Sequence, residues 1–220
     1  MMFMNRIGPL LLCFVPWGLV AEPLTMSLRL VDGQTGKPVA DARIILNNGP
    51  AAEPASAEMI QKNRQFRPGS LVVARGSEVN FPNRDTTQHH VYSFSPAKTF
   101  NLELFADQPD APVVFDKTGV VEVGCNIHDQ MQGFILVTDS SLTAQTNASG
   151  LASFSLPAGM ADRETISLSL WHPRLQDGTE TVEYTVSLPV TNPVELSLDL
   201  AQARRESSRL DGLQQRFRDL

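Results

Sequence analysis

The sequence predicts an all-β protein in which one β-sandwich is inserted into a second, smaller β-sandwich. Short segments that alternate apolar and polar residues recur along the chain, and this period of two is typical of half-buried strands. Clusters of Gly, Pro, Asn and Asp separate the segments at short intervals, as turns do. The central part of the chain has no segment of helical periodicity. Many short strands joined by turns therefore indicate a sandwich.

The first 21 residues are expected to be a signal peptide. Arg6 supplies a positive start, residues 7–20 are apolar, and we take Ala21 as the cleavage point. Pro9 and Pro16 interrupt the apolar run, which is too short for a stable membrane span. We therefore expect export to the periplasm.

The charge and the cysteine content narrow the function further. The formal net charge is −6, which argues against nucleic acid as a partner. Removal of residues 1–21 takes away Cys13 and leaves Cys125 as the single thiol. A lone Cys in an oxidising compartment is an inert buried thiol, an intermolecular disulfide partner or a metal ligand. The neighbouring His128 and Met131 favour the ligand.

Two flanking segments are predicted to complete each other. Residues 22–50 contain strands at 26–31 and 39–46, and they end in an Ala/Pro-rich linker. Residues 140–200 contain four further strands, at 151–156, 166–170, 182–188 and 194–200. Two strands cannot close a core and the later ones leave an open edge. We therefore predict that residues 26–50 pair with residues 142–200.

The central segment, residues 51–139, is predicted to be the inserted domain. At about 90 residues it lies within the usual size of a small domain. Its expected strands are 59–66, 69–74, 77–83, 90–94, 98–105, 113–115, 120–123 and 134–137.

The chemistry is expected in the loop between the last two of these strands, residues 124–133. This loop places Cys125, His128 and Met131 within seven residues. Thiolate, imidazole and a weak axial thioether are ligands that suit copper. A second imidazole is available upstream, from His89 or His90. Adjacent strand residues face opposite ways, so only one enters the site unless the strand bulges. The pattern alone does not decide between His89 and His90.

These residues resemble the cupredoxin family of small blue copper proteins, the amicyanin/plastocyanin-like type. His89 before His90-Val91 is similar to the family's first ligand motif, and Cys125-x-x-His128-x-x-Met131 is similar to its closing loop. The spacing is most like that of the amicyanins. Many members have Asn after the first His, where this chain has His90. Asn83 and Asp85 are expected to form turns.

The flanks resemble the carboxypeptidase regulatory-like, or transthyretin-like, module. The resemblance rests on Thr35-Gly36-Lys37-Pro38, on residues 42–46, and on the turns at 147–150 and 156–159. The combination of the two parts is similar to exported proteins of the methylamine-utilisation type.

The cupredoxin resemblance implies a type 1 copper site, cycling between Cu(I) and Cu(II), with ligands His89, Cys125, His128 and Met131. Such a site has no open position for substrate, so it implies one-electron transfer with a redox partner protein and no catalytic residues. The alternative is copper handling, or an accessory interaction protein with a non-redox site. Neither the partner nor the oligomeric state follows from the sequence.

The last segment, residues 201–220, is predicted to be a short helix or a tail. Leu210, Leu213, Phe217 and Leu220 recur at helical spacing, and Gly212 weakens the helix.

Overall fold

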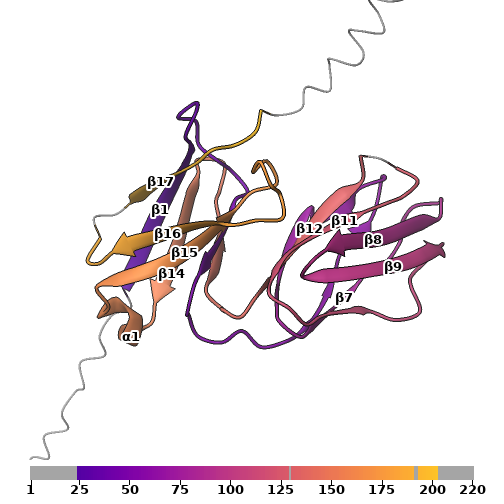
Figure 1. The fold of residues 1–220 in the computed structure, drawn as a ribbon, viewed down its shortest axis with the longest axis horizontal. Coiled ribbons are helices and arrows are strands. Elements are labelled where there is room, and N and C mark those ends of the chain that lie inside the picture. The colour runs from indigo at the N-terminus through magenta and orange to yellow at the C-terminus, as the bar shows by residue number, and fades with distance from the viewer. Residues whose placement is uncertain (1–23, 129, 191–192, 203–220) are drawn as a thin grey trace, which may run out of the picture.

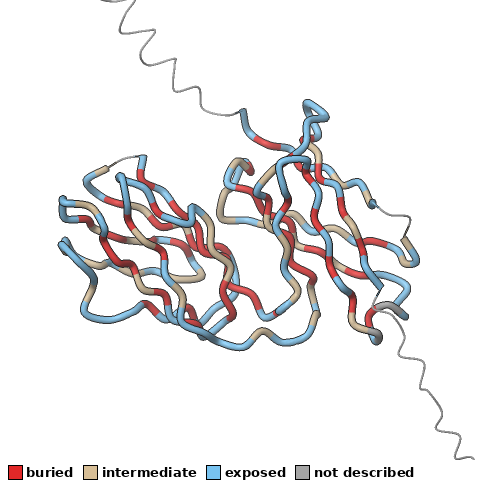
Figure 2. The backbone as a smooth tube through the Cα atoms, turned by 180° about the vertical axis from the view of Figure 1, so that it is seen from behind, coloured by how far each residue is buried: buried red, intermediate tan, exposed pale blue. Residues whose placement is uncertain are grey.

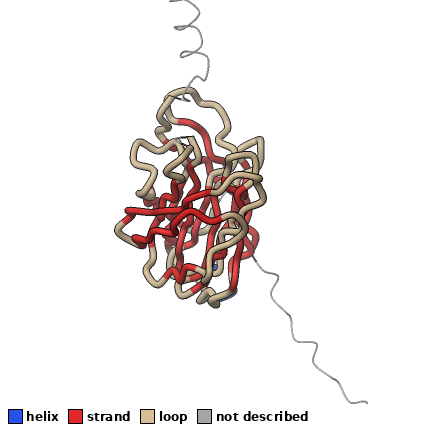
Figure 3. The backbone as a smooth tube through the Cα atoms, turned by 90° about the vertical axis from the view of Figure 1, so that its right-hand side faces the viewer, coloured by secondary structure: helices blue, strands red, loops and turns tan. Residues whose placement is uncertain are grey.

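A computed structural model of the protein describes residues 24–128, 130–190 and 193–202. Regular structure in these residues is almost entirely strand, with one short helix, α1 (Ala158–Ala161). Figure 3, seen from the right-hand side of Figure 1, shows strands through the middle of the molecule and loops at its top and bottom. The all-β prediction is confirmed. The predicted signal peptide, and most of the predicted C-terminal helix, lie outside the described residues.

The strands fall into two groups by position in the chain. The flanking strands are β1 (Leu24–Asp32), β2 (Arg43–Leu46), β13 (Thr143–Gln145), β14 (Leu151–Leu156), β15 (Thr165–Trp171), β16 (Val182–Ser187) and β17 (Val194–Leu198). The central strands are β3 (Ser56–Glu58), β4 (Ile60–Gln61), β5 (Phe66–Arg67), β6 (Ser70–Ala74), β7 (Ser77–Asn80), β8 (His89–Ser95), β9 (Lys98–Phe105), β10 (Val113–Phe115), β11 (Gly119–Gly124) and β12 (Gln132–Thr138).

The flanking strands form two sheets over one hydrophobic core. Strand β1 lies between antiparallel β14 and parallel β17, and β2 lies between β13 and β15, with β16 at the edge. Met26, Leu28 and Leu30 alternate along β1 and are buried in this core. The predicted pairing of the first strands with the strands after residue 142 is confirmed. The pairing follows from burial, because neither segment can cover its own apolar face.

The central strands form a sandwich with its own core. A five-stranded sheet, ordered β6-β12-β11-β8-β9, shares one hydrophobic cluster with a three-stranded sheet, ordered β10-β7-β3. Phe81, Phe115 and Ile135 are fully buried there. Figure 2 shows buried residues alternating with more exposed ones along many strands, and in the central sandwich β8 has this period of two.

Two neighbouring crossings connect the halves, which lie side by side in Figure 1. Ala52 N donates to Asp139 O and Ser141 N donates to Pro50 O, both at 2.8 Å, so the outgoing and returning chains run together. The Phe134 ring of β12 packs on Trp171 of β15, with centroids 4.9 Å apart. Consequently, β12 is buried on both faces after Gln132, which explains its continuous apolar sequence.

One predicted strand, residues 59–66, is wrong. The chain reverses there, and β4 and β5 form a hairpin around residues 62–65. Asn63 and Arg64 both have positive φ angles, 55° and 57°, as the tight turns that suit strand twist require. Lys62 N and Gln65 O close the turn at 2.9 Å. This hairpin lies beside the candidate site.

A second prediction was too long: the strand predicted at 39–46 contains only β2. Asp41 has a φ of 60°, which takes the chain out of the extended conformation. The Thr146 hydroxyl bonds the backbone instead: it accepts from Ala42 N at 2.9 Å and donates to Val39 O at 2.7 Å.

Among the described residues, no helix has the length and apolar character needed to cross a bilayer.

Candidate metal centre

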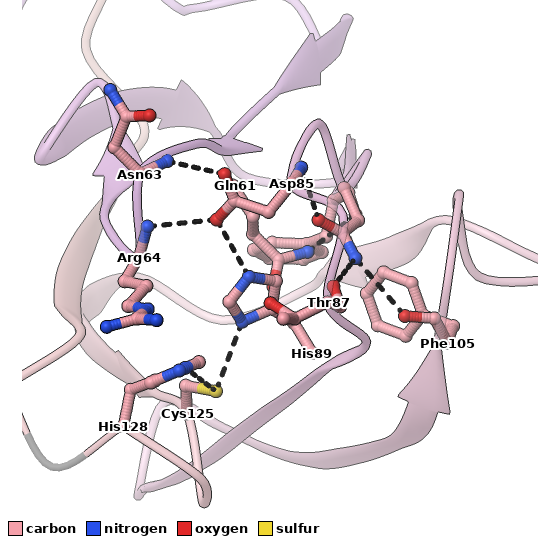
Figure 4. A network of polar contacts seen from close by, with 11 residues as sticks. Gln61, Asn63, Arg64, Asp85, Thr87, His89, Phe105, Cys125 and His128 are labelled. Carbon is pink, nitrogen blue, oxygen red and sulfur yellow. Dashed lines mark hydrogen bonds and ion pairs between the residues drawn. The ribbon is translucent and has the colours of Figure 1, made fainter.

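Three side chains from two separate segments of the central sandwich meet at one point (Figure 4). Cys125 Sγ lies 3.6 Å from His89 Nδ1 and 3.9 Å from His128 Nδ1. One donor atom from each residue lies within 4.8 Å of the others. Two donors bonded to one metal ion at about 2.0–2.3 Å lie roughly 3–4 Å apart, depending on the angle between the bonds. The spacing of these atoms therefore suits a shared ion.

Strand β8 brings His89 to the centre and keeps His90 out of it. His89 is fully buried, at 0% exposure. The β8–β9 pairing is irregular between His89 and Val91. Even so, the His90 ring lies beside Tyr92, with centroids 5.6 Å apart. Residues 90 and 92 share one strand face, so the structure places His90 on the face opposite to Cys125.

The loop between β11 and β12 brings Cys125 and His128 together. His128 N donates to Cys125 O at 3.4 Å and Met131 N donates to His128 O at 2.8 Å. Cys125 N donates to Met131 O at 3.3 Å. Gly124, where the loop begins, lies against the Tyr92 ring: a Cβ there would come within 3.0 Å of Tyr92 Cζ. A side chain at residue 124 would therefore need the Tyr92 ring to shift by a few tenths of an ångström.

Met131, the fourth predicted ligand, lies at the far end of the same loop. Its side chain is 2% exposed, and it belongs to the same buried cluster as Cys125. The hydrogen bond between Cys125 N and Met131 O closes the loop. The Met131 side chain is therefore held in the same buried core as the thiol.

An outer contact fixes the first histidine. His89 Nε2 lies 2.9 Å from Asp85 Oδ2. The Asp85 carboxylate also accepts from the main-chain N–H groups of Asn63 at 2.6 Å and Arg64 at 2.9 Å. The β4–β5 hairpin is thus linked to the site through Asp85.

Two titratable side chains at the site, Asp85 and His128, have pKa values below their ordinary values. Desolvation opposes ionisation of Asp85, but hydrogen bonds from Arg64, Asn63 and His89 outweigh it and lower the pKa of this carboxyl. Burial lowers the pKa of His128, and the charges of His89 and Arg64 add to this effect. Both shifts favour the form that suits an ion: a charged Asp85 carboxylate and a neutral His128 imidazole with a lone pair.

The role of Asp85 was missed in part by sequence reasoning. The expected turn exists: Asp85 N donates to Asn83 Oδ1 at 2.9 Å. The contact of its carboxylate with His89 was not predicted. The available signal was the spacing of four residues from Asp85 to His89, but the hairpin that orients the carboxylate was read as a strand.

No protein-family model matches the chain, and no curated protein is similar to it. Solved structures match part of the chain. A purple cupredoxin from Nitrosopumilus maritimus matches at 22% identity over 37% of this chain and 99% of its own, with a TM-score of 0.31. A reduced amicyanin mutant matches at 17% identity over 43% of this chain and 98% of its own, with a TM-score of 0.35. A copper-containing nitrite reductase from Thermus scotoductus matches at 22% identity over 50% of this chain and 27% of its own, with a TM-score of 0.36.

Proposed function

We propose that this protein binds copper at His89, Cys125, His128 and Met131, and that it transfers single electrons between redox partners. The observation that carries the proposal is the approach of two imidazole Nδ1 atoms to one buried thiol, at 3.6 and 3.9 Å. Bound copper would supply a one-electron couple, Cu(I)/Cu(II). The protein's own residues would bind the ion, shield it from solvent and leave one edge accessible to a redox partner.

The donor set fits copper better than other ions. A thiolate and a thioether are soft ligands that favour Cu(I), and imidazole suits both copper oxidation states. Magnesium, calcium and manganese prefer carboxylate ligands, and among the described residues no carboxylate joins the cluster. Asp85 contacts the outer nitrogen of His89 instead. Structural zinc sites instead use four Cys or His ligands, and the cluster found among the described residues has three.

The burial of the donors favours electron transfer over catalysis on a bound substrate. His89 is fully buried and Cys125 is 4% exposed, so these two side chains present almost no surface to a substrate. The His128 ring is half-buried, and the preceding Ile127 is 48% exposed. We propose that the edge of His128 is where an electron enters and leaves, and that the apolar Ile127 contributes to contact with a partner protein.

The remaining parts of the proposal concern organisation and location. Residues 51–139 would form a cupredoxin domain inserted in a carboxypeptidase regulatory-like domain made of residues 22–50 and 140–200. The two crossings that run together support this division, because an inserted domain leaves and returns at one place. We also propose periplasmic location, after cleavage of residues 1–21.

Copper handling without electron transfer is the second candidate. The buried Cys125 thiol favours this function, because soft ligands retain Cu(I). The two functions differ in redox cycling. A carrier keeps its copper through repeated oxidation and reduction, whereas a copper-delivery protein gives Cu(I) to a competing chelator.

A coulometric redox titration of the copper-loaded protein tests the proposal. We expect one electron per copper, no loss of copper over repeated cycles, and no uptake by Cys125→Ser at matched protein concentration. Loss of copper to a Cu(I) chelator at each reduction would support delivery instead, and equal uptake by Cys125→Ser would refute the site. Glu122→Gln, in the strand before Cys125, is a matched control that should retain copper.

A further inference from the structure

The carboxylate of Asp85 is surrounded by hydrogen-bond donors on the protein side. Asn63 N–H reaches Oδ1 at 2.6 Å, and Arg64 N–H reaches Oδ2 at 2.9 Å. His89 Nε2 lies at 2.9 Å from Oδ2. The Asp85 side chain is only 14% exposed, so these contacts replace most of its hydration. Figure 4 shows the three groups converging on one carboxylate.

The positions of the two main-chain donors come from the turn itself. Asn63 and Arg64 have φ angles of 55° and 57°, and this pair of left-handed residues points two successive N–H groups to the same side. Asp85 is held from behind as well, since its own N–H donates to Asn83 Oδ1. Asn83 in turn donates to Thr87 O at 2.8 Å. The carboxylate therefore has little freedom to turn.

This arrangement decides which nitrogen of His89 carries the hydrogen. An ionised carboxylate only accepts hydrogen bonds, and main-chain N–H groups only donate them. The imidazole atom facing Asp85 must therefore be an N–H donor, which places the hydrogen on Nε2. A neutral imidazole with Nε2–H has its lone pair on Nδ1, and His89 Nδ1 is the atom that faces Cys125 Sγ.

We propose that Asp85, held by the β4–β5 turn, is the positioning residue that sets the tautomer of His89 and strengthens its Nδ1 as a metal ligand. The effect on copper rests on the proposed function, whereas the effect on the tautomer does not. A hydrogen bond from a ligand's outer N–H to a carboxylate raises the basicity of the ligand. Loss of the carboxylate should therefore favour Cu(I) over Cu(II) and raise the reduction potential.

The first test uses the full chain, metal-free and with the thiol reduced. Long-range ¹H–¹⁵N NMR of the His89 ring should show a single Nε2–H tautomer in the wild type. Asp85→Ala and the isosteric Asp85→Asn should both show a mixed or Nδ1–H ring. Asn63→Gly with Arg64→Gly, which keeps the main-chain donors, should leave the tautomer unchanged. A single Nε2–H tautomer in a folded Asp85→Ala or Asp85→Asn protein would overturn the proposal.

The second test measures copper. Competition with a chelator of known affinity should show about 10–100-fold weaker Cu(II) binding by Asp85→Asn, the size usual for an outer partner of a metal ligand, together with a raised reduction potential. Asp116→Asn, an exposed carboxylate paired with Lys98, is the matched control and should change neither value. If the wild type binds no copper, the proposed function fails while the NMR result still decides the role of Asp85. Unchanged affinity and potential in Asp85→Asn would overturn the effect on the metal.

Discussion

Cys125 Sγ lies 3.6 Å from Nδ1 of His89, a residue 36 positions earlier in the chain. No local element could produce this contact. It requires β8 and β11 to be neighbours in one sheet, paired at Tyr92 and Gly124. The sheet thus brings a histidine at the start of one strand to a thiol at the end of its neighbour.

Replacing each of the two adjacent histidines in turn by alanine tests this strand register. We expect His89→Ala to lower Cu(II) affinity by more than the ~10–100-fold that loss of an outer partner costs, because a direct ligand is removed. His90→Ala should leave affinity unchanged, since its ring packs beside Tyr92. Isothermal titration calorimetry with Cu(II) measures the affinity of each variant, and circular dichroism checks that each is folded. A larger loss in His90→Ala would show that the strand register is shifted by one.

The contact between Phe134 and Trp171, which joins the two halves, should contribute strongly to the free energy of unfolding. Phe134 is 4% exposed and packs on Trp171, so Phe134→Ala should lower the free energy of unfolding by about 3–5 kcal/mol. Phe94, which is 80% exposed, is the matched control, and Phe94→Ala should change it by less than about 0.5 kcal/mol. Urea denaturation gives both values. Similar losses in the two variants would mean that the halves do not share this contact.

Two turn glycines separate backbone strain from crowding. Gly36 and Gly150 have similar φ angles, 66° and 73°. A Cβ on Gly36 would meet nothing within 4 Å, whereas one on Gly150 would come within 2.4 Å of Leu30 O. Gly36→Ala should cost about 1–2 kcal/mol, the penalty for the left-handed region alone. Gly150→Ala should cost clearly more. Equal midpoints of urea unfolding for the two variants would contradict this difference.

A buried histidine far from the metal centre should make the protein acid-sensitive. Burial lowers the pKa of His172, with the charge of Arg174 adding to the effect, and His172 Nδ1 accepts from Arg174 N at 3.1 Å. Below its ordinary pKa of about 6.5, the unfolded state gains a proton that the folded state refuses. Stability should therefore fall as pH drops from about 6.5 toward the lowered folded value.

Thermal unfolding at pH 7 and pH 5 of the wild type and His172→Gln measures this contribution. The variant should lose less stability than the wild type over this interval, because glutamine does not titrate. Equal losses in both proteins would assign the acid sensitivity to other groups.

Sequence reasoning worked best where local pattern and burial agree. The alternation in residues 26–31 predicted β1, because one face of this strand meets the core and the other does not. The turn residues around Gly150 correctly marked the start of β14. In the candidate site, Cys125 and His128 stood out because few residue types ligate copper and the loop spaces them closely.

Features that depend on distant contacts were harder to predict. The hairpin at residues 62–65 contains no glycine, yet Asn63 and Arg64 adopt positive φ angles while their N–H groups bind Asp85, over 20 positions away. The turn signal there is weak, because only Asn63 is a common turn residue, and the contact with Asp85 stabilises the turn. For the same reason, the four-residue spacing of Asp85 and His89 was not enough to predict their contact.

The most direct test of the central claim is the visible absorption spectrum of the reduced-thiol protein after addition of one equivalent of Cu(II). A thiolate bonded to Cu(II), with two imidazoles, gives an intense charge-transfer band. We predict that this band is present in the wild type and in His90→Ala, and that it is absent from Cys125→Ser. A colourless wild-type adduct, or a band of equal intensity in Cys125→Ser, would contradict the assignment of copper to this thiol.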